Sequence, residues 1–297
     1  MNHFIVFLNF IRVRQYYKNI IIFLPLVFSI NLFSPTFFFI TIFGFIALCL
    51  VSSAMYVRND IIDVELDKLH PHKSKRALPS GAFTTKQAWF IFIALASAGF
   101  SLAFFLDWKA GVILFLLFLN TEIYSRWMKN IIFLDAFSIA GNFIIRTILG
   151  AVLINSILSP WLILGVFFVA LFLGYTKRKG ELESLEKAGE HRATLKEYTP
   201  FSLNSVVIIS AMMIIATYSL YAIEGPRGDW RLVMTVPLVI FVIFRQLHLS
   251  SINPEIAQRN EILKDKQSTI AMIVFIGLTI CLIYFVPSGF FSHNYHT

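Results

Sequence analysis

The apolar stretch FFFITIFGFIALCLVSSAMYV, residues 37–57, decides the fold class of this chain. It contains no charged residue, and about 20 apolar residues are enough for a helix to cross the hydrocarbon layer of a membrane. Backbone groups in lipid must pair within their own segment, so a helix is expected here. Comparable runs cover residues 89–106, 131–153 and 268–286. The sequence therefore predicts an all-α membrane protein.

Composition supports this prediction and narrows the function. The 297 residues are 57% hydrophobic and only 14% charged, with a mean hydropathy of +0.73, which is too apolar for one water-soluble core. Cys49 and Cys281 lie in apolar segments without metal-like spacing, so neither a disulfide scaffold nor a zinc site is expected. The net charge of +8 comes from basic residues in short loops. That placement favours anionic lipid or phosphate substrates and excludes nucleic acid as the expected partner.

Charged interruptions divide the chain into predicted membrane spans. We predict about nine helices, near residues 19–34, 37–57, 86–106, 110–125, 131–153, 160–176, 202–223, 230–247 and 268–287. Residues 58–85 and 177–201 are the two long, charged connections. No linker or low-complexity segment separates the spans, so residues 1–297 are predicted to form a single domain that carries its active-site loops on these two connections.

The Lys and Arg residues lie mainly on one side of this predicted topology. Of the 25, 21 fall on the side of the N-terminus and the two long connections, whereas the other side has only Lys109, Arg227 and Arg231. Cytoplasmic loops carry the excess of Lys and Arg. The sequence thus predicts a multi-pass protein of the plasma membrane with a cytoplasmic N-terminus, cytoplasmic long loops and an external C-terminus.

A polar cluster follows the second predicted span directly. If the helix continues, its 100° rotation per residue places four oxygen-bearing side chains on one narrow face, and Glu65 on the far side. The four are Asn59, Asp60, Asp63 and Asp67. Converging carboxylates repel one another, and Mg²⁺ typically binds one or two carboxylates while keeping its other positions for water and phosphate. The alternative is a solvated helix end whose acids pair with neighbouring Lys and Arg.

Basic residues downstream complete a recognisable signature. Lys73 and Arg76 add cations where a metal-bound diphosphate would carry excess negative charge. The run Asn59-Asp60-x-x-Asp63-x-x-x-Asp67 resembles the signature of the UbiA prenyltransferase superfamily. Its extension, His70-Pro71-x-Lys73-x-x-Arg76, is similar to the branch of decaprenyl-phosphate phosphoribosyltransferases.

Two further segments resemble the same branch. At the N-terminus the matching residues are Arg12, Arg14, Gln15, Lys18 and Asn19; membrane anchoring is the alternative to phosphate binding there. In the fifth span they include Asp135 and Arg146. An arginine inside an apolar span is costly and needs a partner, so Arg146 is predicted to face a phosphate or to pair with Asp135.

The end of the sixth span departs from the superfamily at large. Members that use prenyl diphosphates carry a second acidic motif, Asp-x-x-x-Asp, at this place. This chain has Tyr175, then Lys177, Arg178 and Glu181, with the last three on one helical face, which resembles the phosphoribosyltransferase branch. A simple positive-inside stop is the alternative. Later matches to the branch are His191, Arg192, Leu195, Tyr198, Pro254, Glu255 and Asp265.

The resemblance implies a function. It implies Mg²⁺-dependent transfer of 5-phosphoribosyl from 5-phosphoribosyl 1-diphosphate to a membrane polyprenyl phosphate, with release of diphosphate, in cell-envelope glycan biosynthesis. Mg²⁺ on Asp60, Asp63 and Asp67 would bind the leaving diphosphate. The implied substrate-binding residues are Asn59, Lys18, Asn19, Lys73, Arg76, Arg146, Tyr175, Lys177, Arg178 and Glu181.

The sequence leaves two other functions open. One is prenyl transfer from a prenyl diphosphate to an aromatic or glycerol-phosphate acceptor, against which the missing second acidic motif counts. The other is a transporter without chemistry, which would be expected to carry polar residues near mid-bilayer and inverted repeats. The sequence also allows a homo-oligomer.

Overall fold

The regular structure in the described part of the chain is entirely helical. The structure is a computed structural model, and it describes residues 3–69, 73–184, 193–224, 230–252 and 265–287. The chain folds into two compact units. Unit 1 comprises Met1–Leu26, Asn31–Ser125 and Ile145–Ser156; unit 2 comprises Val27–Ile30, Arg126–Ile144 and Ile157–Thr297. The single domain predicted from the sequence stays a prediction.

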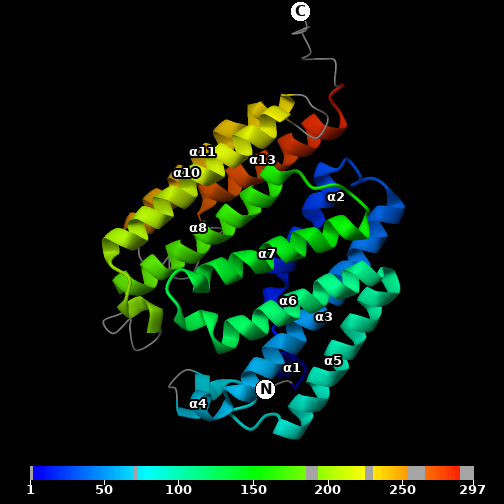
Figure 1. Cartoon of the computed structure of the whole chain (residues 1–297), viewed down its shortest axis with the longest axis vertical. Coiled ribbons are helices and arrows are strands. Elements are labelled where there is room, and N and C mark those ends of the chain that lie inside the picture. The colour runs from blue at the N-terminus through cyan, green and yellow to red at the C-terminus, as the bar shows by residue number, and fades with distance from the viewer. Residues whose placement is uncertain (1–2, 70–72, 185–192, 225–229, 253–264, 288–297) are drawn as a thin grey trace, which may run out of the picture. The chain divides into compact units, whose positions relative to one another are not determined.

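Unit 1 is built around one long helix, α3 (Pro35–Ile62). Ser34 precedes this helix and Pro35 begins it, which suits a proline because the first turn has no backbone N–H partner to lose. α5 (Thr85–Leu106) runs beside α3 and begins with a capping box between Thr84 and Gln87 (Figure 1). The other elements are α1 (His3–Phe10), the 3₁₀ helix η1 (Val13–Phe23), α4 (Val64–Leu69), the 3₁₀ turn η2 (Lys73–Lys75) and α6 (Trp108–Arg126).

Close packing in unit 1 joins η1 to α3 and to the second half of α7 (Leu134–Leu153). The shared core contains Ile22, Leu48, Val51, Leu114 and Leu149, all at most 2% exposed. By contrast, α5 leaves large apolar side chains such as Phe90, Ile93 and Phe105 uncovered. Lipid is the natural environment for such a surface.

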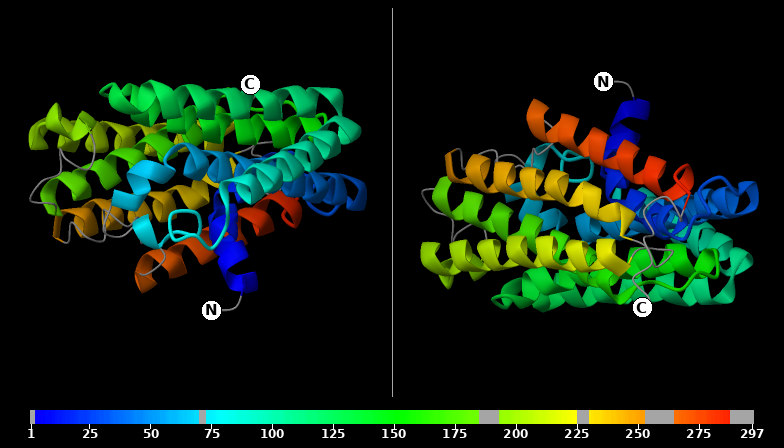
Figure 2. Two further views of the ribbon diagram at one scale, coloured as in Figure 1. Left: turned by 90° about the horizontal axis from the view of Figure 1, so that it is seen from below. Right: turned by 90° about the horizontal axis from the view of Figure 1, so that it is seen from above.

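Unit 2 contains two pairs of helices in contact. α8 (Pro160–Ser184) lies beside α10 (Pro200–Glu224), and α11 (Val236–Ile252) lies beside α13 (Lys266–Tyr284), as the turned views of Figure 2 also show. The first half of α7 joins the α8–α10 core. Three short 3₁₀ elements complete the unit: η3 (Met128–Asn130), η4 (Ala193–Lys196) and η5 (Arg231–Thr235).

Seven described helices are long and apolar enough to cross a membrane, and each coincides with a predicted span. They are α3, α5, α7, α8, α10, η5 together with α11, and α13. The chain is therefore an integral membrane protein. The predicted count of nine is not confirmed, because two segments differ. One is α6, a 19-residue helix in which Lys109, Asn120 and Glu122 interrupt the apolar run.

The other segment, predicted as a span over residues 19–34, is not one continuous helix. The 3₁₀ helix η1 ends at Phe23, and a short helix, α2 (Leu24–Phe28), follows. Pro25 cannot donate the backbone hydrogen bond that an uninterrupted α-helix would require at this point. Ile30 then adopts a left-handed backbone with φ 64°, which ends the helical path.

Candidate active site

The spacing of acids at the end of α3 produces a partly buried site in unit 1. α3 ends at Ile62 and α4 begins at Val64, but helical hydrogen bonds continue across Asp63: its N–H bonds to the Asn59 carbonyl at 2.9 Å, and the Asp67 N–H bonds to the Asp63 carbonyl at 2.8 Å. The predicted helical register is therefore nearly preserved. The helix does not continue uninterrupted, because Asp63 forms its C-cap.

The side chains follow the predicted faces. Asp60 and Asp67 are 4% and 3% exposed, and Asp63 is half-buried. Glu65 points outward, where its carboxylate lies 2.7 Å from the ammonium of Lys68. Burial of two carboxylates without partners would be costly, so their surroundings must supply positive charge.

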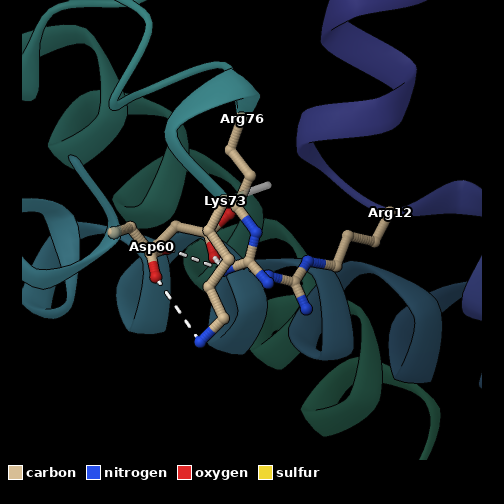
Figure 3. A network of polar contacts seen from close by, with 5 residues as sticks. Arg12, Asp60, Lys73 and Arg76 are labelled. Atoms are coloured by element: carbon tan, nitrogen blue, oxygen red, sulfur yellow. Dashed lines mark hydrogen bonds and ion pairs between the residues drawn. The ribbon is translucent and has the colours of Figure 1, made fainter. Parts of the chain in front are cut away.

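Three basic side chains supply that charge. The Arg76 Nη1 atom lies 2.7 Å from Asp67 Oδ2 and 3.4 Å from Asp60 Oδ1, so one guanidinium bridges both acids. Arg12 forms an ion pair with Asp60, and Lys73 Nζ lies 3.7 Å from Asp67 Oδ1. Figure 3 shows that Arg12 reaches the cluster from a different segment of the chain than Lys73 and Arg76 do. We call these five residues the acid–base cluster.

Arg12 is the residue of this cluster that the predicted site lacked. The N-terminal motif included it, but no role at the acidic residues was expected. Its backbone adopts a left-handed conformation with φ 56° where α1 meets η1, and its guanidinium also lies over the Tyr56 ring at 4.7 Å. The contact with Asp60 crosses 48 residues of sequence, and no local pattern predicts it.

The donor chemistry of the cluster fits a hard divalent cation. In the described part of the chain, no three His, Cys, Asp or Glu side chains are arranged closely enough to hold a metal ion. Mg²⁺ needs only one or two protein carboxylates, however, and prefers oxygen ligands. The guanidinium of Arg76 between Asp60 and Asp67 shows that positive charge is accommodated there. The half-buried Asp63 could serve as a further ligand.

A second polar group in unit 1 lies inside the apolar spans. Arg146 is 9% exposed, and its Nε donates to Asn19 Oδ1 at 3.0 Å. The Asn19 amide in turn donates to Cys49 Sγ and Ser52 Oγ. The structure thus connects two residues that the sequence assigned to separate motifs. Lys18, beside them in sequence, is half-buried, with its ammonium 5.8 Å from the Tyr17 ring centre.

In unit 2, the cations at the end of α8 differ in burial, although the sequence grouped them together. Arg178 is 3% exposed, and its Nε donates to Asp135 Oδ2 at 3.0 Å, while Lys177 has a side chain that is 44% exposed. Both contact Glu181, at 3.5 Å from Arg178 Nη1 and 3.9 Å from Lys177 Nζ, as expected for one helical face. Asp135 is therefore paired with Arg178 in unit 2. Its predicted alternative partner was Arg146.

Aromatic side chains complete this buried pair. The Tyr198 hydroxyl accepts a hydrogen bond from the Phe133 N–H at 2.9 Å and lies 3.5 Å from Asp135 Oδ1. Burial and the nearby Asp135 carboxylate raise the pKa of Tyr198 to about 12, so its hydroxyl stays protonated. Tyr175, which was predicted to bind substrate, is 2% exposed and packs edge-on against Phe133 and Tyr198. Its role in substrate binding stays a prediction.

Several residues of the predicted motifs lie outside the described residues. They are His70, Pro71, His191, Arg192, Pro254 and Glu255. Asp265, in contrast, is described: it caps α13 by accepting from the Ser268 N–H, and it pairs with Arg245, whose hydrogen bonds hold the pKa of Asp265 well below its usual range.

Comparisons with known proteins agree with the motifs. Residues 21–261 match the UbiA prenyltransferase family. The chain is 28% identical over 256 residues to the decaprenyl-phosphate phosphoribosyltransferase of Mycolicibacterium smegmatis, covering 82% of this chain and 80% of that protein. It is 29% identical over 203 residues to the protein of the same name from Mycobacterium tuberculosis, covering 67% of each.

Solved structures show the same fold. A UbiA homologue from Archaeoglobus fulgidus, solved with bound GPP and Mg²⁺, superposes with a TM-score of 0.73 at 15% identity, covering 94% of this chain and 99% of that one. The sequence comparisons confirm the resemblance inferred from the motifs, and the structural comparison confirms the fold.

Proposed function

The chain belongs to the UbiA prenyltransferase family and is a membrane transferase, and from this premise we propose that it transfers 5-phosphoribosyl from 5-phosphoribosyl 1-diphosphate to a polyprenyl phosphate. The observation that carries the proposal is the acid–base cluster, which places two buried carboxylates among three cations at one end of α3. Acids suit a metal ion and the cations suit a diphosphate, so one cluster can bind a metal diphosphate.

Asp60 and Asp67, with Asp63 beside them, would hold Mg²⁺ in this proposal. The bound ion would neutralise charge on the departing diphosphate. Arg12, Lys73 and Arg76 carry three positive charges and bind the diphosphate oxygens that the metal does not neutralise. Asn59, half-buried one residue before Asp60, would complete the metal or phosphate shell.

The acceptor needs positioning more than activation. A polyprenyl phosphate oxygen is already anionic, so it attacks C1 of the ribose without a general base. The new bond joins that oxygen to C1, the bond from C1 to the diphosphate oxygen breaks, and diphosphate leaves with the electron pair. Arg146, held by Asn19, and Lys18 are the basic residues of unit 1 assigned to the acceptor phosphate. The lipid tail remains in the apolar surroundings of the spans.

The sequence motif at the end of α8 assigns Lys177 to the donor as well. The donor carries a separate 5-phosphate, for which a half-exposed ammonium is a suitable ligand. Arg178 has Asp135 and Glu181 as ion-pair partners, so we assign it first to holding the end of α8. The names of the similar mycobacterial proteins support this donor over a prenyl diphosphate.

A donor comparison tests the proposal. Purified protein in lipid nanodiscs is incubated with Mg²⁺, a polyprenyl phosphate and either labelled 5-phosphoribosyl 1-diphosphate or a labelled prenyl diphosphate with an aromatic acid. We expect lipid-extractable label from the phosphoribosyl donor alone. Product from the prenyl donor alone would replace the proposal by prenyl transfer, and no product from either donor would remove it.

A further inference from the structure

Arg76 occupies an unusual position for a substrate-binding residue, because it already binds both acids expected to hold the metal. Its Nη1 atom contacts Asp67 at 2.7 Å and Asp60 at 3.4 Å. A divalent cation would need the same carboxylate oxygens. The guanidinium and the metal therefore compete for one set of ligands.

The three cations of the cluster differ in how firmly they are held. Arg12 is anchored by its ion pair to Asp60 and by the Tyr56 ring, and its side chain is 28% exposed. Arg76 follows η2, its side chain is 37% exposed, and the described contacts of its side chain go to Asp60 and Asp67. Lys73 is more exposed and lies farther from the acids. Arg76 is thus the cation that bridges the acids and can also leave them.

Charge balance explains why Arg76 lies between the two acids. Buried carboxylates without counter-ions are costly, so the site without metal needs Arg76. A divalent cation alone would replace one positive charge with two and would leave Arg76 without partners. A metal diphosphate removes both problems, because its phosphate oxygens provide Arg76 with new acceptors.

We propose that Arg76 is a placeholder cation, which neutralises Asp60 and Asp67 before substrate binds and moves to the donor diphosphate when the metal enters. This inference rests on the proposed function, since it takes these acids as the metal ligands. Its consequence is that metal and diphosphate bind cooperatively, each weakly when alone.

One substitution should therefore have opposite effects on two ligands. Arg76→Gln removes the competitor, so the protein without substrate should bind Mn²⁺, a spectroscopic probe for Mg²⁺, about twofold to fivefold more tightly, which corresponds to one partly exposed ion pair. The same substitution removes a phosphate ligand, so labelled 5-phosphoribosyl 1-diphosphate should bind about tenfold more weakly at saturating Mn²⁺.

The measurements are Mn²⁺ titrations followed by electron paramagnetic resonance, and equilibrium binding of the labelled donor without acceptor lipid. Lys68→Gln is the matched control, because Lys68 is exposed and pairs with the outward Glu65. It removes one nearby positive charge without touching the cluster and should change neither affinity. Arg76→Lys keeps the charge, so both of its affinities should lie between those of the wild type and those of Arg76→Gln. The lysine variant also provides the test if the glutamine variant does not fold.

Two results would overturn the inference. One is an Mn²⁺ affinity of Arg76→Gln equal to or below that of the wild type, whether or not donor affinity is also lost. The other is an equal rise of Mn²⁺ affinity in Lys68→Gln. Failure of the proposed function is distinguishable. If the opposite effects appear but the wild type transfers no ribosyl group to lipid, the proposed reaction fails and the placeholder role stands.

Discussion

At the end of α3, Asp60 and Asp67 are buried on one side of the chain, whereas Glu65 faces outward beside Lys68. Substitution of Asp60, Asp63 or Asp67 by alanine should reduce the rate of transfer about 100-fold to 1,000-fold, because each removes a group that stabilises developing charge. Glu65→Ala should stay within about twofold of the wild type, as expected for an exposed side chain. Initial rates of purified variants check this, with size-exclusion profiles as the control for folding. Equal losses for Glu65→Ala and Asp63→Ala would contradict the assigned faces.

In the proposed function, the end of α8 carries a structural cation, Arg178, and a binding cation, Lys177. Arg178→Gln leaves Asp135 as a buried charge without its guanidinium partner and should destabilise the protein by about 3–5 kcal/mol. Lys177→Gln should leave thermal unfolding unchanged and raise the KM for the phosphoribosyl donor roughly tenfold. Thermal unfolding in detergent and steady-state kinetics measure the two effects. If Lys177→Gln alters neither KM nor kcat, the proposal that Lys177 contacts the donor is wrong.

Residue spacing predicted some of these positions and missed others for a physical reason. The faces of Asp60, Asp67 and Glu65 follow from helical geometry, which depends only on neighbours in sequence. Arg12 contacts Asp60 from a left-handed backbone, a conformation that arginine rarely adopts. Glycine is the residue that usually marks such a position in a sequence, and position 12 has none. The pairing of Asp135 with Arg178 instead of Arg146 also depends on packing between distant segments.

Among the elements, η1 depends on close contact with the second half of α7. A Cβ atom on Gly150 would overlap the carbonyl oxygen of Ile22, so Gly150→Ala must push η1 away from α7. We expect a destabilisation of about 1–3 kcal/mol, typical of overpacking, and reduced activity because Asn19 and Arg146 lie on these two elements. Gly277→Ala in α13 is the control, because no described atom outside its own helical backbone and chain neighbours lies within 4 Å of its added Cβ. Unchanged unfolding of Gly150→Ala would contradict the close packing.

The elements themselves were predictable where composition decides them. Seven spans follow from hydropathy alone, since uninterrupted apolar runs must be helical in lipid. The segment 19–34 was predicted as one span because its composition is apolar, but hydropathy does not register the missing N–H of Pro25 or the left-handed Ile30. α6 is a helix as predicted, and only its polar residues set it apart from the seven.

For the whole molecule, the distribution of Lys and Arg predicts the orientation in the membrane. A reporter enzyme fused after Thr297 should be active on the external side, and one fused before Met1 should be active in the cytoplasm. Accessibility to a membrane-impermeant thiol reagent, applied to single cysteines introduced at Lys109 and Lys129, provides an independent check. Cytoplasmic activity of the C-terminal fusion would mean that one predicted span does not cross.

At the scale of the whole molecule, the sequence motifs predict the family but not every contact of the site. The motifs indicated the family, which the match over residues 21–261 confirms, and the similar phosphoribosyltransferases cover most of the chain. The pattern could not reveal that Arg76 bridges Asp60 and Asp67, because that contact depends on where the chain after η2 places the guanidinium.

Transfer of the ribosyl group is tested most directly by a donor labelled at two positions. 5-Phosphoribosyl 1-diphosphate carries one label in the ribose and another in the terminal phosphate of its diphosphate, and the protein is supplied with Mg²⁺ and a polyprenyl phosphate. We predict that the ribose label enters the lipid extract while the phosphate label remains in water as diphosphate, both at equal rates and only with the acceptor present. Both labels remaining together in the aqueous phase, in a sample whose protein is folded, would contradict the proposed reaction.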